Sequence, residues 1–285
     1  MFVLKNPQLT VEVDKRGAQL THVFDNRTGF DYIWNGEAWP KHAPILFPSI
    51  GRSTDDCYLI NDKAYEMPQH GFVADYDFDL LSQTENSLTL SFGGNDETFK
   101  YYPFHFELHV RYTLVENELL VSFEVKNFED KDLSYSLGFH PAFNLEGAFE
   151  EAELSVRPER AQLYQHEIVK IPFPYRSGNI KPVLVEGSKF KLNRAMFAEG
   201  LVILENKIDF VSLKGVKHGV AMELHDFPNL CLWTKEDEEL HYLCLEPFYG
   251  LPDEVNTLQE LSLKEGNDRL EAHGTKAYRC RMTFE

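Results

Sequence analysis

Four residues able to transfer protons or bind oxygen atoms stand in short motifs far apart in the chain. His140 lies in LGFHPAFN, Glu246 in HYLCLEP, His70 in QHGF and Arg52 in PSIGR. An imidazole and a carboxylate that reach one ligand can act as general acid and general base. A guanidinium can bind and polarise the ligand's oxygens. These residues are therefore candidates for acid–base chemistry on a polar ligand.

Each candidate also has an ordinary structural explanation. One histidine among eleven is more often structural or exposed than catalytic, and a glutamate at a strand end is usually solvated. Arg52 could pair with one of the 46 acidic residues. The chain contains no HExxH, GxSxG or GxxxxGK[ST] pattern, so the sequence signals of zinc proteases, α/β-hydrolases and P-loop enzymes are missing.

The segment LSYSLGFH, residues 133–140, predicts how His140 is positioned. Its large apolar residues alternate and predict the core face of a strand: Leu133, Tyr135, Leu137 and Phe139. The small and polar residues between them, ending with Gly138 and His140, share the opposite face, which suits a concave surface open to a ligand. Pro141 cannot donate to a sheet, so we expect regular pairing to end at His140.

The segment 229–246 predicts a hairpin that carries Glu246 beyond the acidic loop KEDEEL (235–240). We expect Thr234 to lie opposite His241, because a slip by one residue would mix the apolar and polar faces. That register places three pairs on one face: Trp233 with Tyr242, Cys231 with Cys244, and Asn229 with Glu246. A surface of rings beside a carboxylate suits a sugar, because the sugar's C–H faces stack on rings and its hydroxyls need acceptors.

Alternation with a period of two extends over most of the chain and predicts an all-β protein. Residues 104–114 and 119–127 alternate on either side of a polar turn. Comparable stretches lie at 8–13, 18–24, 87–92, 201–204 and 277–284. A short helix is expected at 255–261, and the proline-rich segment 171–182 reads as a long connection. We predict a single domain, residues 1–285, folded as a large antiparallel β-sandwich.

Composition limits the partners and the location. The 285-residue chain has 28 basic and 46 acidic residues, a formal net charge of −18. An acidic surface without a basic run argues against binding to nucleic acid or to anionic membranes. No apolar run reaches the roughly 18 residues of a membrane span. The N-terminus lacks a signal-peptide pattern, and the four cysteines lack CxxC spacing. We therefore expect a cytoplasmic protein with reduced thiols.

Four segments together resemble the aldose 1-epimerase (galactose mutarotase) family, especially its LacX-like branch. In chain order they are FPSIGR, PQHGF, GFHPAFN and LCLEPFYGLPD. The resemblance implies a β-sandwich of the galactose mutarotase type that interconverts the α and β anomers of a free aldohexose such as glucose or galactose. It implies a small-molecule sugar as the partner, with no metal and no organic cofactor. We expect a monomer or a homodimer.

The resemblance also implies roles for the candidate residues. Glu246 matches the family's general base, which removes the proton from the C1 hydroxyl. His140 matches the general acid, which protonates the ring oxygen. His70 and Arg52 match residues that bind and polarise the sugar. Gln69 and Asn144 in the same segments, and Trp233 on the ring surface predicted beside Glu246, are expected to contact the sugar as well.

The chain departs from its relatives at two places. The better-known galactose mutarotases carry a further aspartate in a motif that is absent here, and Asp226 in HDFPNL is a nominal substitute. Hexose-6-phosphate epimerase relatives resemble HGFAR, whereas this chain has HGFVAD, which replaces the arginine and adds Asp75. The loss of this cation, with the net charge of −18, disfavours a phosphorylated sugar.

Three alternatives to a free-sugar mutarotase stay open. A hexose-6-phosphate epimerase would need Arg52 and distant basic residues to bind the phosphate. A non-catalytic sugar-binding protein of the same fold would not need both an acid and a base. A glycoside hydrolase would need a second carboxylate beside Glu246, and the sequence offers none in a comparable segment.

Overall fold

The computed structural model describes residues 1–171, 174–205, 207–235 and 240–285. Its named strands pair antiparallel, which confirms the predicted all-β class. The helical elements in this part of the chain are short 3-10 turns: η1 (Thr54–Asp56), η2 (Val73–Asp75), η3 (Phe149–Glu151), η4 (Arg194–Phe197) and η5 (Leu261–Leu263). Among the described residues, no helix is long and apolar enough to cross a bilayer.

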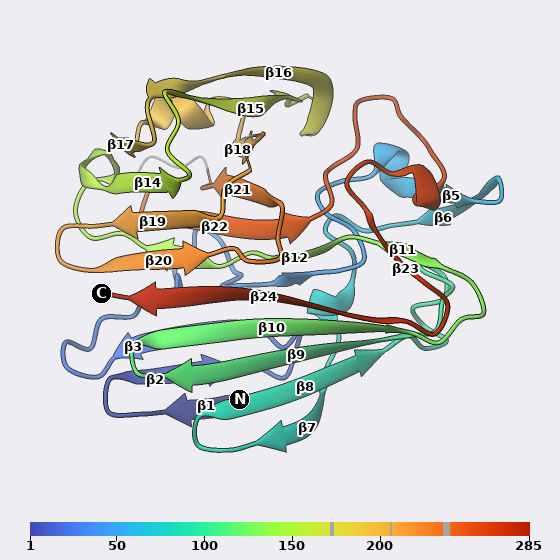
Figure 1. Ribbon diagram of the computed structural model, residues 1–285, viewed down its shortest axis with the longest axis horizontal. Helices are drawn as coiled ribbons and strands as arrows, with labels where there is room; N and C mark the ends of the chain where they lie inside the picture. Colours follow the sequence, from blue (N-terminus) through green and yellow to red (C-terminus); the bar gives the residue numbers. More distant parts are fainter. Residues whose placement is uncertain (172–173, 206, 236–239) are drawn as a thin grey trace.

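One layer is a nine-stranded sheet whose long strands run side by side across the front of Figure 1. In spatial order its strands are β17 (Lys189–Lys191), β14 (Glu153–Arg157), β19 (Phe210–Lys214), β20 (Gly219–Glu223), β24 (Thr275–Phe284), β10 (Glu118–Asn127), β9 (Phe106–Val115), β8 (Ser87–Gly93) and β7 (Asp79–Gln83). Burial alternates residue by residue along β10, with its apolar side chains in the core. The alternation predicted for 104–114 and 119–127 is therefore confirmed.

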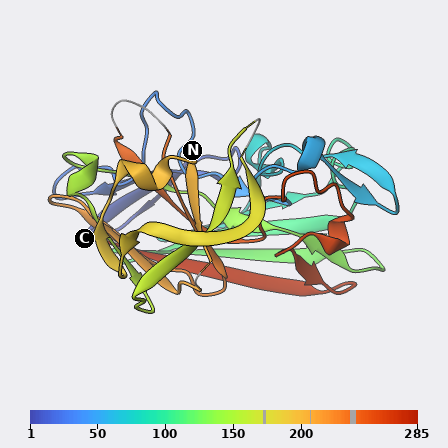
Figure 2. The ribbon, with the colours of Figure 1, turned by 90° about the horizontal axis from the view of Figure 1, so that it is seen from above.

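The second layer is an eight-stranded sheet, and its far edge strand curves across the molecule in Figure 2. In spatial order its strands are β16 (Tyr175–Glu186), β15 (Gln162–Val169), β18 (Leu201–Leu204), β21 (Asn229–Trp233), β22 (Tyr242–Tyr249), β12 (Leu137–Phe139) and β4 (Ile45–Leu46), while β13 (Ala142–Asn144) also pairs with β22. The two sheets meet in one core, where Phe123 of β10 and Phe139 of β12 have ring centroids 6.2 Å apart. The predicted large antiparallel sandwich is confirmed.

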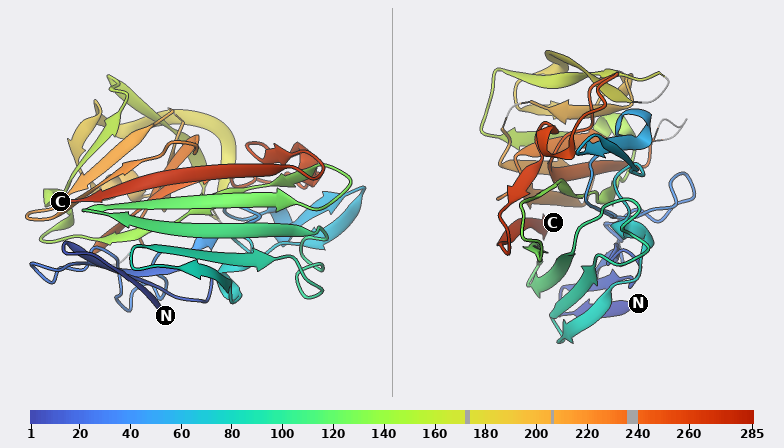
Figure 3. Two further views of the ribbon diagram at one scale, coloured as in Figure 1. Left: turned by 60° about the horizontal axis from the view of Figure 1, so that its bottom comes forward. Right: turned by 90° about the vertical axis from the view of Figure 1, so that its right-hand side faces the viewer.

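Three small sheets flank the sandwich. They are β1 (Phe2–Lys5), β2 (Leu9–Val13) and β3 (Leu20–Asp25); β5 (Cys57–Ile60) with β6 (Lys63–Glu66); and β11 (Leu133–Tyr135) with β23 (Asp268–Leu270). Figure 3 shows the N-terminal sheet below the long strands and the β5–β6 hairpin at the opposite end from the C-terminus.

The predicted continuous strand over 133–140 is wrong, although its predicted core face is right. The chain leaves one sheet after β11 and enters another at β12, with Ser136 between them. The Ser136 N–H donates to the Pro48 carbonyl at 2.8 Å, and its hydroxyl donates to Asn267 at 2.6 Å, so both groups are used outside a strand ladder. Alternation survives this change of partners because both strands bury the same apolar face.

The predicted register of the hairpin that carries Glu246 is wrong by two residues. Cys231 pairs with Glu246, and Trp233 pairs with Cys244. A shift by two residues leaves every side chain on its predicted face, so apolar patterning cannot detect it. The loop sets the register, and most of the predicted loop, residues 236–239, lies outside the described part of the chain.

Two other local predictions are wrong. Residues 255–261 form no helix except where Leu261 begins the turn η5, because Asn256 takes a positive φ of 60° and the Val255 N–H donates to Arg176. Much of the segment 171–182 belongs to β16 instead of a connection. Pro182 did not prevent this strand, because β16 lies at the edge of its sheet, where a missing N–H costs little.

A tight turn at His70 and Gly71 brings the QHGF motif against the strand end at Phe47. Gly71 has φ +76°, and a Cβ there would lie 2.0 Å from the Phe47 carbonyl oxygen. The Phe72 N–H donates to the same oxygen at 3.0 Å, which anchors the turn. Glycine is therefore required here both by conformation and by space.

We expect Gly71→Ala to destabilise the fold more than Gly29→Ala. Gly29 has a similar φ of +75°, but no atom lies within 4 Å of the place that a Cβ would occupy there. The control should cost about 1–2 kcal/mol for the left-handed backbone. Gly71→Ala should cost that amount plus about 1–3 kcal/mol for the backbone shift that removes the clash. Urea unfolding measures both free energies, and equal losses would contradict the close approach.

Candidate active site

A cavity of about 330 Å³ opens over the centre of the eight-stranded sheet. Side chains from β4, β18, β21 and β22 line it, together with loop residues from three N-terminal segments. Six of the seven predicted site residues line this cavity: Arg52, Gln69, His70, His140, Trp233 and Glu246. The tertiary structure therefore brings together motifs that are separated by almost 200 residues.

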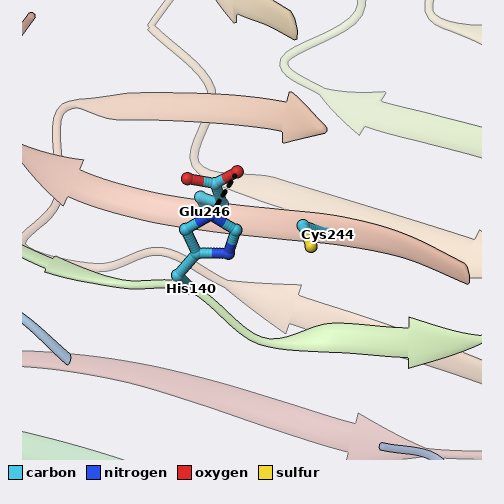
Figure 4. Close-up of side chains that lie close together, drawn as sticks. All are labelled: His140, Cys244 and Glu246. Atoms are coloured by element: carbon cyan, nitrogen blue, oxygen red, sulfur yellow. Dashed lines mark ion pairs between the residues drawn. The ribbon is translucent and has the colours of Figure 1, made fainter. Parts of the chain in front are cut away.

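Glu246 and His140 form a buried pair at the cavity (Figure 4). The His140 Nε2 lies 3.3 Å from the Glu246 Oε1, and only 7% and 4% of the two side chains are exposed. Glu246 belongs to β22, and His140 follows directly after β12, which pairs with β22. The His140 N–H donates to the Pro44 carbonyl at 3.0 Å, which fixes the backbone where the strand ends.

Burial moves the pKa values of this pair in opposite directions. Desolvation raises the pKa of Glu246 well above its usual value, and a hydrogen bond from Cys231 opposes this only in part. Desolvation lowers the pKa of His140 well below its usual value, and the nearby His70 and Lys41 lower it further. Both shifts favour the uncharged forms of the pair, a protonated carboxyl group and a neutral imidazole. When charged, each becomes a stronger base or acid than in water.

His70 lies beside this pair as a neutral imidazole. Its ring stands edge-on to that of His140, with centroids 5.6 Å apart. The Gly51 N–H donates to the His70 Nδ1 at 3.1 Å, so the neutral ring carries its proton on Nε2. Burial, with the charges of Lys41 and Arg52, lowers the pKa of His70 to about 4. His70 is therefore a hydrogen-bond donor at neutral pH.

Arg52 is held in place at the cavity wall. Its Nη1 donates to both carboxylate oxygens of Asp56 at 2.8 and 2.9 Å, and its Nη2 donates to the Gln69 side-chain oxygen at 3.4 Å. The backbone around it is also fixed, because the Asp253 N–H donates to the Arg52 carbonyl and the buried Lys264 ammonium lies 2.7 Å from the Asp253 carboxylate. These contacts orient the guanidinium before any ligand arrives.

Sequence reasoning missed the residue that covers the pair. Trp39 stacks on His140 with ring centroids 5.0 Å apart and stands edge-on to Trp233 at 5.2 Å. Lys41 and Asp75 also line the cavity. Trp39 and Lys41 lie in EAWPKHAP, which has no strand alternation. Without alternation, the sequence does not predict where their side chains point.

Several residues named from the sequence lie elsewhere. Asn144 is not among the residues lining the cavity, and its side-chain amide donates to the Asp31 and Ile33 carbonyls, both at 2.8 Å. Tyr242 packs under the aromatic rings with 2% exposure and does not line the cavity. Asp226 pairs with Arg279 at the surface, so it does not replace the missing aspartate.

Comparison with known proteins places these features in a family. The aldose 1-epimerase family matches residues 1–266. The chromosomal LacX protein of Lactococcus lactis subsp. lactis is 33% identical, covering 93% of this chain and 90% of that protein. The chain belongs to the aldose 1-epimerase family.

Solved structures agree in more detail. A galactose mutarotase-like protein from Lactobacillus casei ATCC 334 superposes with a TM-score of 0.95 at 34% identity, covering 100% of both chains. A galactose mutarotase related enzyme from Lactobacillus acidophilus has a TM-score of 0.92 at 28% identity, covering 100% of this chain and 97% of that one. The fold is therefore of the galactose mutarotase type, as the sequence predicted.

The raised pKa of Glu246 predicts that Glu246→Gln stabilises the protein at alkaline pH. A folded-state pKa above the unfolded value of 4.5 gives stability that is complete below that value and is lost as pH rises. Glutamine mimics the protonated carboxyl group and removes this loss. We expect a gain of about 0.5–2 kcal/mol near pH 8 that shrinks toward acidic pH.

Urea unfolding at several pH values measures this difference. The exposed Glu85 provides the matched control, because Glu85→Gln makes the same chemical change without altering a buried charge. A gain for Glu246→Gln that did not depend on pH would show that the buried carboxyl group is not the cause.

Proposed function

We propose that this protein is an aldose 1-epimerase that interconverts the α and β anomers of a free aldohexose such as glucose or galactose. The main support is the buried contact of 3.3 Å between Glu246 and His140 at a cavity large enough for a small molecule. Mutarotation needs one base and one acid on one sugar, and this pair supplies one of each. Membership in the aldose 1-epimerase family supports the same reaction.

The neutral pair can reach its reactive form without a proton from solvent. Transfer of the Glu246 proton to His140 gives a carboxylate and an imidazolium with the same total charge. The carboxylate then removes the proton from the C1 hydroxyl while the imidazolium protonates the ring oxygen, and the C1–O5 bond breaks to give the open aldehyde. Rotation about C1–C2 and reclosure return both protons and produce the other anomer.

The cavity wall supplies contacts for the sugar's hydroxyls and its apolar faces. Trp39 and Trp233 offer ring surfaces for C–H stacking, and both lie within 6 Å of the His140 ring centre. Arg52, Gln69 and the neutral His70 offer donors that polarise hydroxyl and carbonyl oxygens. The reaction consists of proton transfers, cleavage and re-formation of the C1–O5 bond and one bond rotation, and an acid–base pair can catalyse it.

Polarimetry on freshly dissolved α-D-glucose and α-D-galactose tests the proposal. We expect the protein to accelerate relaxation, and Glu246→Gln and His140→Ala each to lower kcat by about 10²–10⁴-fold, because each removes one proton-transfer group. The exposed Glu85 and His105 provide controls of the same residue types. Glu85→Gln and His105→Ala should keep the wild-type rate.

Two outcomes would contradict parts of the proposal. Saturable sugar binding without faster relaxation, for glucose, galactose and other aldoses, would identify a sugar-binding protein instead of an epimerase. Full activity in Glu246→Gln or His140→Ala would leave the activity intact but refute the assigned role.

A second candidate is a hexose-6-phosphate 1-epimerase, and the position of Lys41 favours it. Lys41 and Arg52 both line the cavity, so two cations face the ligand despite the net charge of −18. The acidic Asp75 lines the same cavity and opposes an anionic ligand. Lys41 and Arg52 support the phosphorylated sugar, whereas Asp75 and the net charge oppose it. We therefore propose the free sugar first and the phosphorylated sugar second.

Rates on glucose and glucose 6-phosphate separate the two candidates. We expect a higher kcat/KM for glucose. If the phosphate is the natural substituent, kcat/KM is higher for glucose 6-phosphate, and Lys41→Ala lowers it by about 10- to 100-fold through loss of a charged hydrogen bond. Lys189→Ala, at an exposed position in β17, is the control for the loss of one positive charge.

A further inference from the structure

Two thiol groups lie against the Glu246–His140 pair, and the proposed proton transfers use neither of them. Cys244 precedes Glu246 by two residues on β22, so its side chain is on the same face of the sheet. Cys231 lies directly opposite Glu246 on β21 and also lines the cavity. Both thiols are buried, with exposures of 0% and 3%.

These side chains place three different ligand atoms close together. One ligand atom each from His140, Cys244 and Glu246 lies within 4.8 Å of the other two. The His140–Glu246 distance of 3.3 Å is already close to the roughly 3.4 Å that separates neighbouring ligands of a tetrahedral zinc ion. The 4.8 Å limit exceeds that separation by roughly 1 Å, so the side chains would have to move closer by up to about that amount to share one ion.

The imidazole is free to serve as a ligand. The buried His140 Nδ1 has no hydrogen-bond partner in the described part of the chain, and Nε2 faces Glu246. In Figure 4 the second ring nitrogen lies on the side of the imidazole toward Cys244, while the dashed line joins the first to Glu246. Nε2 is the ligand nitrogen in this site, because it is the one that lies 3.3 Å from Glu246, and the ring proton is then on Nδ1.

We propose that His140, Cys244 and Glu246 form a binding site for a thiophilic divalent cation of the zinc class. Nitrogen, sulfur and carboxylate ligands suit Zn²⁺, whereas a thiolate disfavours Mg²⁺ and Ca²⁺. Three protein ligands leave a fourth position of a tetrahedral ion open, and two of them, His140 and Glu246, line the cavity. On binding, the Cys244 thiol and the protonated Glu246 carboxyl group each lose a proton to solvent.

Metal binding would block the proton transfers, and this consequence rests on the proposed function. A cation that takes the lone pairs of His140 and Glu246 leaves neither acid nor base for the sugar. The cation is therefore an inhibitor that competes with the sugar for the same cavity.

Titration of the full-length protein with Co²⁺ tests the site without any sugar. Cobalt bound to a thiolate gives a sulfur-to-cobalt charge-transfer band, and we expect one Co²⁺ per chain, displaced by Zn²⁺. Cys244→Ser should abolish the band, and Zn²⁺ affinity should fall by about tenfold or more. Cys280→Ser, in a buried position of the other sheet, and Cys57→Ser, at a partly exposed position, should bind as the wild type does.

Two results would overturn the site: no charge-transfer band in the wild type, or a band that persists in Cys244→Ser. If Cys244→Ser does not fold, Glu246→Gln takes its place, since it is expected to be stable and must also lose at least about tenfold in Zn²⁺ affinity. Unchanged affinity there would equally overturn the proposal.

Polarimetry with added Zn²⁺ separates this site from the proposed function. In an active enzyme, Zn²⁺ should raise the apparent KM for the sugar with little change in kcat. A charge-transfer band in a protein without mutarotase activity would uphold the metal site and reject the proposed function. Mutarotase activity without the band would uphold the proposed function and reject the metal site.

Discussion

The contact between a buried carboxyl group and a buried imidazole is the constraint on which the site depends. Isolated in the core, an ionised Glu246 would cost several kcal/mol, so it must be neutral or paired. His140 is the partner, and it can approach within 3.3 Å only because β22 has β12 and β13 as neighbours. The central strands of the eight-stranded sheet are therefore also the supports of the candidate chemistry.

Burial has opposite effects on stability and on reactivity. It raises the pKa of Glu246 and lowers that of His140, and both shifts favour the uncharged groups. The same shifts make the carboxylate a better base and the imidazolium a better acid once a proton has moved between them. Two thiols at this carboxyl group add soft donor atoms. The site thus combines groups suited to proton transfer with groups suited to a cation.

Alternating apolar residues predicted the sandwich because a strand with one buried face needs that pattern. Segments such as 104–114 and 119–127 satisfied it along their whole length. Parity also placed Glu246 and Trp233 on one face of their hairpin, which the structure confirms. The register could not be predicted, because a shift by two residues preserves every face. Trp39 was missed because its loop has no periodicity from which a direction can be derived.

The sequence by itself determined the fold class, the family and the faces of the strands, because these follow from residue types and their local spacing. Only the tertiary structure decided which distant motifs meet. It brought His70, Arg52 and Trp39 to His140 and Glu246, and it used the Asn144 side chain for backbone carbonyls instead of the cavity. The reason is physical: side-chain direction in loops and the exclusion of water arise from contacts between segments, and no local pattern records those contacts.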